Sequence, residues 1–97
     1  MSYEDVYARS LADPEEFWGE AAQAVDWDKP WQRVLDDSNP PFYRWFAGGT
    51  INTCHNALDR HLEAGRGEQT ALIYDSPVTD TKQTISYAGL RDRVALF

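Results

Sequence analysis

The sequence predicts a small α+β fold, with helices at the N-terminus and a β-hairpin that further helices flank. Three observations predict it. Pro14 opens a segment whose apolar residues recur at helical spacing, and the pair Gly48-Gly49 precedes another such segment. Farther on, two apolar stretches over residues 70–74 and 84–87 are separated by turn-forming residues, which is typical of a hairpin.

Composition limits the class of protein. A chain of 97 residues allows one small domain. The net charge of -7 disfavours binding to nucleic acid or an anionic membrane surface, because both require clustered Lys and Arg. The single cysteine, Cys54, excludes an internal disulfide, and no apolar run approaches the roughly 20 residues that cross a bilayer. We therefore expect a cytoplasmic protein.

Two helices are expected before residue 26. Ser2 and Asp5 resemble a capping arrangement for a brief helix that ends near Leu11. Asp13 is a cap candidate and Pro14 suits a first helical turn, so a second helix is expected over residues 14–25. Its apolar residues follow the spacing i, i+3, i+4, i+7: Trp18, Ala21, Ala22 and Val25.

Residues 26–41 are expected to form an ordered loop, because they lack a sustained period and contain three prolines. Trp27 and Trp31 would anchor this loop by packing against the rest of the chain. The alternative is that these two side chains form an exposed patch that binds carbohydrate or a protein partner.

Residues 40–62 are the structural centre of the predicted fold. Trp45 and Phe46 belong to a strand, and Trp45 is expected to be buried. Gly48-Gly49 permits a tight bend, and Asn52 caps a helix that starts near Thr53. The apolar face of this helix and its terminating glycine are Cys54, Leu58, His61, Leu62 and Gly65.

The last third of the chain predicts a hairpin and a helix. The unbroken run Ala71-Leu72-Ile73-Tyr74 indicates a strand covered on both faces, and a turn over residues 75–82 leads to the second strand. Ser86 caps a final helix in which three apolar residues share a face: Leu90, Val94 and Phe97. Because this pattern reaches Phe97 without a stop signal, we expect the sequence to be a piece of a longer protein.

The cysteine and the histidines lack the spacing that a site requires. Cys54 and His55 are neighbours on a helix and point about 100° apart, which disfavours a nucleophilic dyad. Together with His61 they also lack ligand pairs at i, i+3 or i, i+4, which disfavours a metal site. Cys54 is better interpreted as a small buried hydrophobic residue.

Three other groups favour a structural role. Glu15 and Glu16 suit the positive end of a helix, so a metal or general-acid cluster is disfavoured. Local pairing explains Asp59-Arg60-His61 better than an acid–base trio does. Gly48-Gly49-Thr50 and Gly65-Arg66-Gly67 lack the glycine spacing and the Lys-Ser/Thr of a phosphate loop. We therefore expect no catalytic, cofactor-binding or metal-binding residue in this chain.

Four stretches, in order, resemble the N-terminal region of AMP-forming short-chain acyl-CoA synthetases: PEEFWGEAAQAVDWDKPW, SNPPFYRWFAGGTINTCHNALDRHL, ALIYD and TISYAGLRD. The leader YARSLADPEEFW and the run Cys54-His55-Asn56-Ala57 are more similar to propionate–CoA ligase than to acetyl-CoA synthetase. Ligases for acetate or 3-hydroxypropionate are the alternatives. Gly89 departs from the family, which usually has a Glu there that completes a capping box with the residue matching Ser86.

The resemblance implies a parent enzyme that forms an acyl-adenylate from a small carboxylate and ATP with Mg²⁺, then transfers the acyl group to CoA. The family's phosphate loop, ribose-binding acid, hinge and adenylation lysine have no counterpart here. The parent would therefore use ATP, Mg²⁺ and CoA, whereas this chain would bind none of them and be inactive alone.

The resemblance also implies how the chain is organised. Residues 1–41 would form a helical extension with a wrapping loop, and residues 42–97 the first strands and helices of the AMP-binding domain within a larger α/β adenylate-forming fold. The partner of the chain would be the remainder of the parent enzyme, and the chain alone would self-associate through its apolar strand. The alternative, from another class, is a free-standing acidic module that presents Trp27 and Trp31 to a protein partner.

Overall fold

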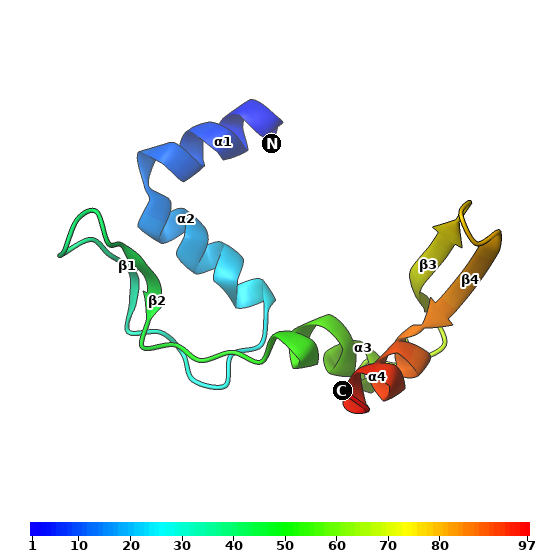
Figure 1. The fold of residues 1–97 in the computed structure, drawn as a ribbon. Coiled ribbons are helices and arrows are strands. Elements are labelled where there is room, and N and C mark those ends of the chain that lie inside the picture. The colour runs from blue at the N-terminus through cyan, green and yellow to red at the C-terminus, as the bar shows by residue number, and fades with distance from the viewer. The chain divides into compact units, whose positions relative to one another are not determined.

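The computed structural model describes residues 1–97, which form two compact units, residues 1–52 and residues 53–97. The first unit holds two helices and a two-stranded sheet, and the second holds a hairpin with helices before and after it (Figure 1). The predicted α+β class is confirmed. The larger α/β fold and the division of a parent enzyme at residues 41 and 42 stay predictions.

The first two helices begin where their caps were predicted. In α1 (Tyr3–Ala12) the Ser2 hydroxyl accepts from the Asp5 amide at 3.2 Å, and the Asp5 carboxylate accepts from the Ser2 amide at 3.1 Å. In α2 (Pro14–Ala21) the Asp13 carboxylate accepts from the Glu16 amide at 3.0 Å. Each cap pairs amides that the first turn of a helix leaves without partners.

The predicted end of α2 at Val25 is wrong by one turn. The α-helix stops at Ala21 and continues as a 3-10 turn, η1 (Ala22–Ala24), after which Val25 is extended with φ of -116°. The Trp27 indole N–H donates to the Ala22 carbonyl oxygen at 2.9 Å. That carbonyl would accept from a backbone amide if the α-helix continued, so the indole takes the place of a helical hydrogen bond.

The predicted loop over residues 26–41 contains a strand, which corrects that expectation. Strand β1 (Arg33–Asp36) pairs antiparallel with β2 (Arg44–Ala47), with Leu35 opposite Trp45. β1 holds two apolar residues between two charged ones, so it shows no alternation that a sequence pattern could reveal. The strand forms because β2 supplies the partner. The strand expected at Trp45 and Phe46 is confirmed as β2.

Trp45 is 47% exposed, so the expectation that it is buried is wrong. Phe46, its neighbour, is half-buried and has a positive φ of 50°, which is unusual for a bulky side chain. Neighbouring residues of a strand face opposite sides of the sheet. When only one face of a two-stranded sheet is covered, only the residue on that face is shielded from solvent. The covered residue here is Phe46.

The helical segment after Asn52 starts at Thr53 as predicted, but half of it is not α-helical. A π-helix, η2 (His55–Asp59), precedes the short α3 (Arg60–Glu63), and the Arg60 amide donates to the His55 carbonyl five residues back. Because the turn of a π-helix is wider than that of an α-helix, residues at α-helical spacing no longer lie on one face. Within the predicted face, Leu58 is buried at 7% exposure, whereas Cys54, His61 and Leu62 are half-buried.

Gly65 ends α3 as predicted. Its φ is 84°, and its amide donates to the Leu62 carbonyl at 2.9 Å. The Arg66 amide donates to the His61 carbonyl, also at 2.9 Å. These two bonds define a Schellman motif, in which a left-handed residue directly after the helix lets the chain close over its last carbonyls.

The predicted hairpin is confirmed and is longer than expected (Figure 1). β3 (Thr70–Ser76) pairs antiparallel with β4 (Thr81–Ser86). Residues 75, 76, 81 and 82, expected in the turn, extend the strands because Asp75 and Lys82 face each other and form an ion pair at 3.4 Å.

The last helix, α4 (Tyr87–Ala95), begins at a residue that was expected to end the second strand. The Ser86 hydroxyl accepts from the Gly89 amide at 3.1 Å, so the predicted cap is confirmed. Phe97 lies outside the helix and cannot share its face, which corrects the predicted apolar set. At the start of α4, Gly89 lies against the buried side chain of Ile85.

Candidate functional site: an arginine network and an aromatic cluster

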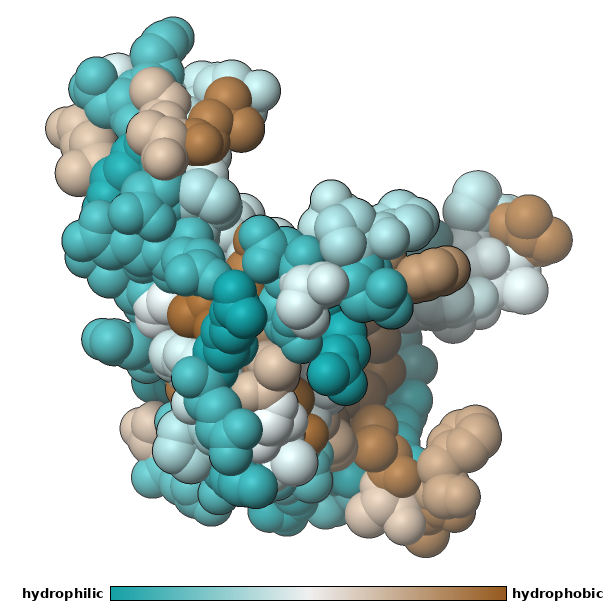
Figure 2. Space-filling view, turned by 90° about the vertical axis from the view of Figure 1, so that its left-hand side faces the viewer, coloured by the Kyte–Doolittle hydropathy of each residue, from teal (hydrophilic) through white to brown (hydrophobic).

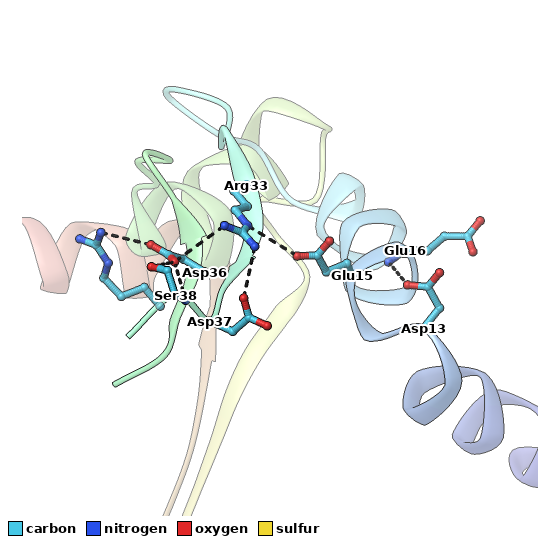
Figure 3. A network of polar contacts seen from close by, with 8 residues as sticks. Asp13, Glu15, Glu16, Arg33, Asp36, Asp37 and Ser38 are labelled. Carbon is cyan, nitrogen blue, oxygen red and sulfur yellow. Dashed lines mark hydrogen bonds and ion pairs between the residues drawn. The ribbon is translucent and has the colours of Figure 1, made fainter. Parts of the chain in front are cut away.

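Arg33 is the centre of the largest polar network in the first unit. Its guanidinium lies 3.2 Å from an Asp37 carboxylate oxygen, 3.9 Å from Glu15 and 4.0 Å from Asp36 (Figure 3). The side chain of Arg33 is 53% exposed, so these ion pairs are solvated. The network joins the first turn of α2 to β1. It consists of carboxylates gathered around the Arg33 guanidinium, and exposed ion pairs of this kind each contribute little to stability.

Asp36 is held ionised by its neighbours. The Ser38 hydroxyl donates to its carboxylate at 2.6 Å and the Ser38 amide at 3.1 Å, and Arg44 lies 3.3 Å from the other oxygen. These donors lower the pKa of Asp36 below its usual value, with the Ser38 side chain as the largest cause. A carboxylate with a lowered pKa is a poor general acid or base near neutral pH.

Three acidic residues of α2 and its cap have partners within the first unit. Asp13 caps the helix, and Glu15 pairs with Arg33. Glu20, near the end of α2, pairs with Arg9 of α1, whose guanidinium also lies 5.8 Å above the centre of the Phe17 ring. The capping role of Asp13 is therefore confirmed, whereas the ion pairs of Glu15 and Glu20 were not predicted.

Trp27, Trp31 and Phe46 form an aromatic cluster. The ring centres of Trp27 and Trp31 lie 5.0 Å apart. The Phe46 ring centre lies 5.3 Å from that of Trp27 and 5.5 Å from that of Trp31. Such tilted and edge-on arrangements at these distances are favourable packing. The anchoring interpretation of the two tryptophans is confirmed, and both are half-buried in this cluster.

The cysteine and the two histidines lie in the helical segment that follows Asn52, with Cys54 before η2, His55 in η2 and His61 in α3. Cys54 is a free, half-buried thiol. His61 has its Nδ1 atom 2.7 Å from the Arg66 guanidinium, and its ring lies 5.1 Å from the Tyr87 ring. No group of three or more His, Cys, Asp and Glu side chains in residues 1–97 is arranged to hold a metal ion.

The remaining candidate motifs have structural roles. Arg60 donates to the Asn56 side-chain oxygen at 3.0 Å, so one of its partners lies one turn back along the helical segment. Gly48 adopts a positive φ of 83°, as a tight bend requires. Gly49 lies against the Trp27 ring, where an added Cβ would come within 2.8 Å of a ring carbon.

The arginine network is the feature that sequence reasoning missed. Arg33, Asp36 and Asp37 fall in the stretch predicted to be a loop, where charged residues have no assigned face. The only signal was the spacing of Arg33 from the two aspartates, which is common on exposed segments. Long-range partners such as Glu15 have no signature in the sequence.

Charge is divided unequally between the two units. Residues 1–52 contain ten Asp and Glu and four Lys and Arg, a net charge of -6, whereas residues 53–97 contain six and five, a net charge of -1. In Figure 2 hydrophilic side chains (teal) cover much of the visible face, with separate hydrophobic groups (brown) among them. The excess of negative charge thus lies almost entirely in the first unit.

Comparison with known families identifies the chain. The sequence profile described as acetyl-coenzyme A synthetase N-terminus matches residues 3–57, more than half of the chain. The chain belongs to this family. The acetyl-coenzyme A synthetase N-terminus family region thus spans α1, α2, the sheet of β1 and β2 and the start of the following helical segment.

Curated relatives extend the similarity along nearly the whole chain. The protein named acyl-CoA synthetase short-chain family member 3, mitochondrial, from Rattus norvegicus is 52% identical over 93 residues, which is 96% of this chain and 14% of the relative. The protein named propionate–CoA ligase from Salmonella typhimurium is 47% identical over 94 residues, 97% of this chain and 15% of the relative. The corresponding Escherichia coli propionate–CoA ligase is also 47% identical over 94 residues.

The resemblance seen in the sequence is therefore confirmed at the level of the family. The chain spans 14 to 15% of the length of these relatives.

The carboxylates of the network around Arg33 are paired with arginine side chains, Glu15 with Arg33 and Asp36 with Arg44. None of the helices is long and apolar enough to span a membrane.

Proposed function

We propose that this chain is the N-terminal, non-catalytic portion of an ATP-dependent, AMP-forming propionate–CoA ligase. The parent enzyme would convert propionate, ATP and CoA to propionyl-CoA, AMP and pyrophosphate. The observation that carries the proposal is the 47% identity over 94 residues to proteins named propionate–CoA ligase. Acetate and 3-hydroxypropionate are the competing substrates, because relatives of this family also carry the broader name of short-chain acyl-CoA synthetase.

A scaffold role for the chain within the enzyme is supported by how its charged residues are used. Arg9, Arg33 and Arg44 each pair with carboxylates of the same unit. Charge stabilisation of a phosphoryl or adenylyl group requires cations aimed at the phosphates. We propose that ATP, Mg²⁺ and CoA bind to residues outside this chain, and that the remainder of the enzyme is its partner.

A cytoplasmic location is proposed for the parent enzyme, by analogy with the bacterial ligases. The rat relative is named as mitochondrial, which makes the matrix the alternative compartment.

The test is an activity assay on the longer polypeptide that carries this segment. We expect ATP-dependent and CoA-dependent formation of propionyl-CoA and AMP, with a higher kcat/KM for propionate than for acetate or 3-hydroxypropionate. The 97-residue chain alone, at equal concentration, should form no acyl-CoA. A longer polypeptide that prefers acetate would overturn the assignment to propionate, and acyl-CoA formation by the chain alone would overturn the scaffold role.

A further inference from the structure

Strand β3 has apolar side chains exposed on both of its faces. Leu72 and Tyr74 project to one face and are each 45% exposed, and Ile73 projects to the other and is 67% exposed. Several large apolar side chains exposed on one strand are uncommon on the solvent-exposed surface of a folded monomer. An unbroken apolar run is typical of a strand that other layers cover on both sides.

The same strand has a free edge. Its sheet consists of β3 and β4 only, so alternate amides and carbonyls of β3 point away from β4. Residues Ala71 to Tyr74 carry no charge, and the charged residue that follows them, Asp75, is paired with Lys82 of β4. β3 thus presents an unprotected edge of a two-stranded sheet, and a sheet of this size has little independent stability.

We infer that the free edge of β3 pairs with a β-strand from the remainder of the longer polypeptide, and that layers of the same polypeptide cover its two faces. This inference rests on the proposed function, because it takes the chain to be part of a larger enzyme. The relatives supply the length that such a cover needs, since the chain spans only 14 to 15% of them.

A second copy of the chain is a poorer occupant. Pairing β3 with β3 of a second copy would satisfy the edge, but the side chains of Leu72, Ile73 and Tyr74 lie above and below the sheet, where a strand added at the edge does not reach. Only a polypeptide that contributes both a strand and covering elements removes the exposure seen on both faces.

The test compares two exposed apolar residues of the same hairpin in the longer polypeptide. Ile73→Lys places a charge in the middle of β3, and Val78→Lys places the same charge in the turn, at a side chain that is 93% exposed. We expect Ile73→Lys to lower the midpoint of thermal unfolding and Val78→Lys to leave it unchanged. Ile73→Thr, which keeps the β-branched shape, should lower the midpoint by an intermediate amount and keeps the test informative where Ile73→Lys does not fold.

Hydrogen exchange supplies the second measurement. The amides of residues 71–74 that do not bond to β4 should exchange more slowly in the longer polypeptide than in the 97-residue chain under the same conditions. Equal exchange in the two proteins, or equal midpoints for Ile73→Lys and Val78→Lys, would overturn the inference. The inference would also be overturned if the longer polypeptide formed a concentration-dependent dimer that Ile73→Lys dissociates. In that case the strand that pairs with β3 would come from a second copy.

These outcomes are distinguishable from failure of the proposed function. A longer polypeptide that forms propionyl-CoA yet shows no protection of β3 retains the function and loses this inference. One that protects β3 and forms no acyl-CoA retains the inference about the strand and loses the proposed activity.

Discussion

The indole nitrogen of Trp27 lies 2.9 Å from the carbonyl oxygen of Ala22 and donates a hydrogen bond to it. Trp27 thereby ends the helical region formed by α2 and η1 and, through its ring, joins that end to the aromatic cluster with Trp31 and Phe46. One side chain therefore fixes both the length of a helix and the position of the segment that follows it.

Replacement of Trp27 by Phe should remove the hydrogen bond and keep most of the ring contacts. We expect the free energy of unfolding to fall by about 1 kcal/mol, the usual net value of one hydrogen bond, because the Ala22 carbonyl is left with a longer bond of 3.4 Å from the Val25 amide. Urea denaturation followed by circular dichroism measures the difference. Trp18→Phe, at a half-exposed tryptophan, is the control, and an equal loss in both variants would contradict a role for the indole N–H.

Gly49→Ala should destabilise the first unit through crowding. A Cβ atom at this position would lie 2.8 Å from a carbon of the Trp27 ring, so the indole or the backbone must shift. We expect a loss of about 1 to 3 kcal/mol, as for other overpacked sites. Gly67→Ala is the matched control, because a Cβ there meets its nearest neighbours at 3.8 Å. Denaturation midpoints that do not differ between the two variants would show that the indole can move freely.

Arg33→Gln should have a small effect that depends on salt. The ion pairs of Arg33 are solvated, and exposed pairs contribute about 0 to 1 kcal/mol each at most. The free energy of unfolding should therefore fall by about 1 kcal/mol at low ionic strength. The difference should vanish at about 1 M salt, where ions screen charges within a few ångströms. Arg91→Gln, which affects only a pair with the adjacent Asp92, is the control. A loss that persists in high salt would indicate a packing role for the Arg33 stem.

The capping box of α1 should weaken in acid. Hydrogen bonds from the Ser2 amide and hydroxyl lower the pKa of Asp5 below its usual value of 3.8. Because the folded state favours the ionised carboxylate, its contribution is fully present above pH 3.8 and is lost as the pH falls through the lower folded value. The helical signal of the wild-type chain should decline over that window more than that of Asp5→Asn. Parallel acid titrations of the two proteins would refute this assignment.

Gly89→Glu should stabilise the second unit. A glutamate would replace the glycine that costs about 0.5 to 1 kcal/mol within a helix, and its side chain could accept from the Ser86 amide to complete a capping box. The new Cβ would lie 3.3 Å from the Ser86 hydroxyl oxygen, which must give by a few tenths of an ångström. We expect a net gain of about 0.5 to 1.5 kcal/mol in calorimetry. Ser86→Ala should have the opposite sign, and a loss in Gly89→Glu would show that the hydroxyl cannot adjust.

Local chemistry explains which features could be predicted from the sequence. Ser2, Asp13 and Ser86 cap helices by bonds to amides three residues away, and Gly65 ends a helix through its own backbone. Each of these effects is contained within one turn, so a short window of sequence reveals it.

Features that depend on distant partners could not be predicted. β1 exists through its pairing with β2, and the end of α2 is set by an indole five residues beyond Ala22. The π-helix η2 has no composition signal, because His55 to Asp59 would suit an α-helix equally well. For the candidate site, the spacing of Cys54, His55 and His61 along the chain was enough to disfavour a dyad or a metal site. The network around Arg33 could not be predicted, because Glu15 is distant from Arg33 in the sequence.

The aromatic cluster has a spectroscopic consequence. All four tryptophans of the chain, Trp18, Trp27, Trp31 and Trp45, lie in residues 1–52, and residues 53–97 contain none. Tryptophan emission therefore reports the first unit alone, and emission quenched by close ring contacts would mark the state in which Trp27 and Trp31 are packed together. The second unit contributes nothing to this signal, so its unfolding is followed separately, by hydrogen exchange of the amides of residues 53–97. Comparison of the two measurements shows whether the two units lose their structure together or one after the other.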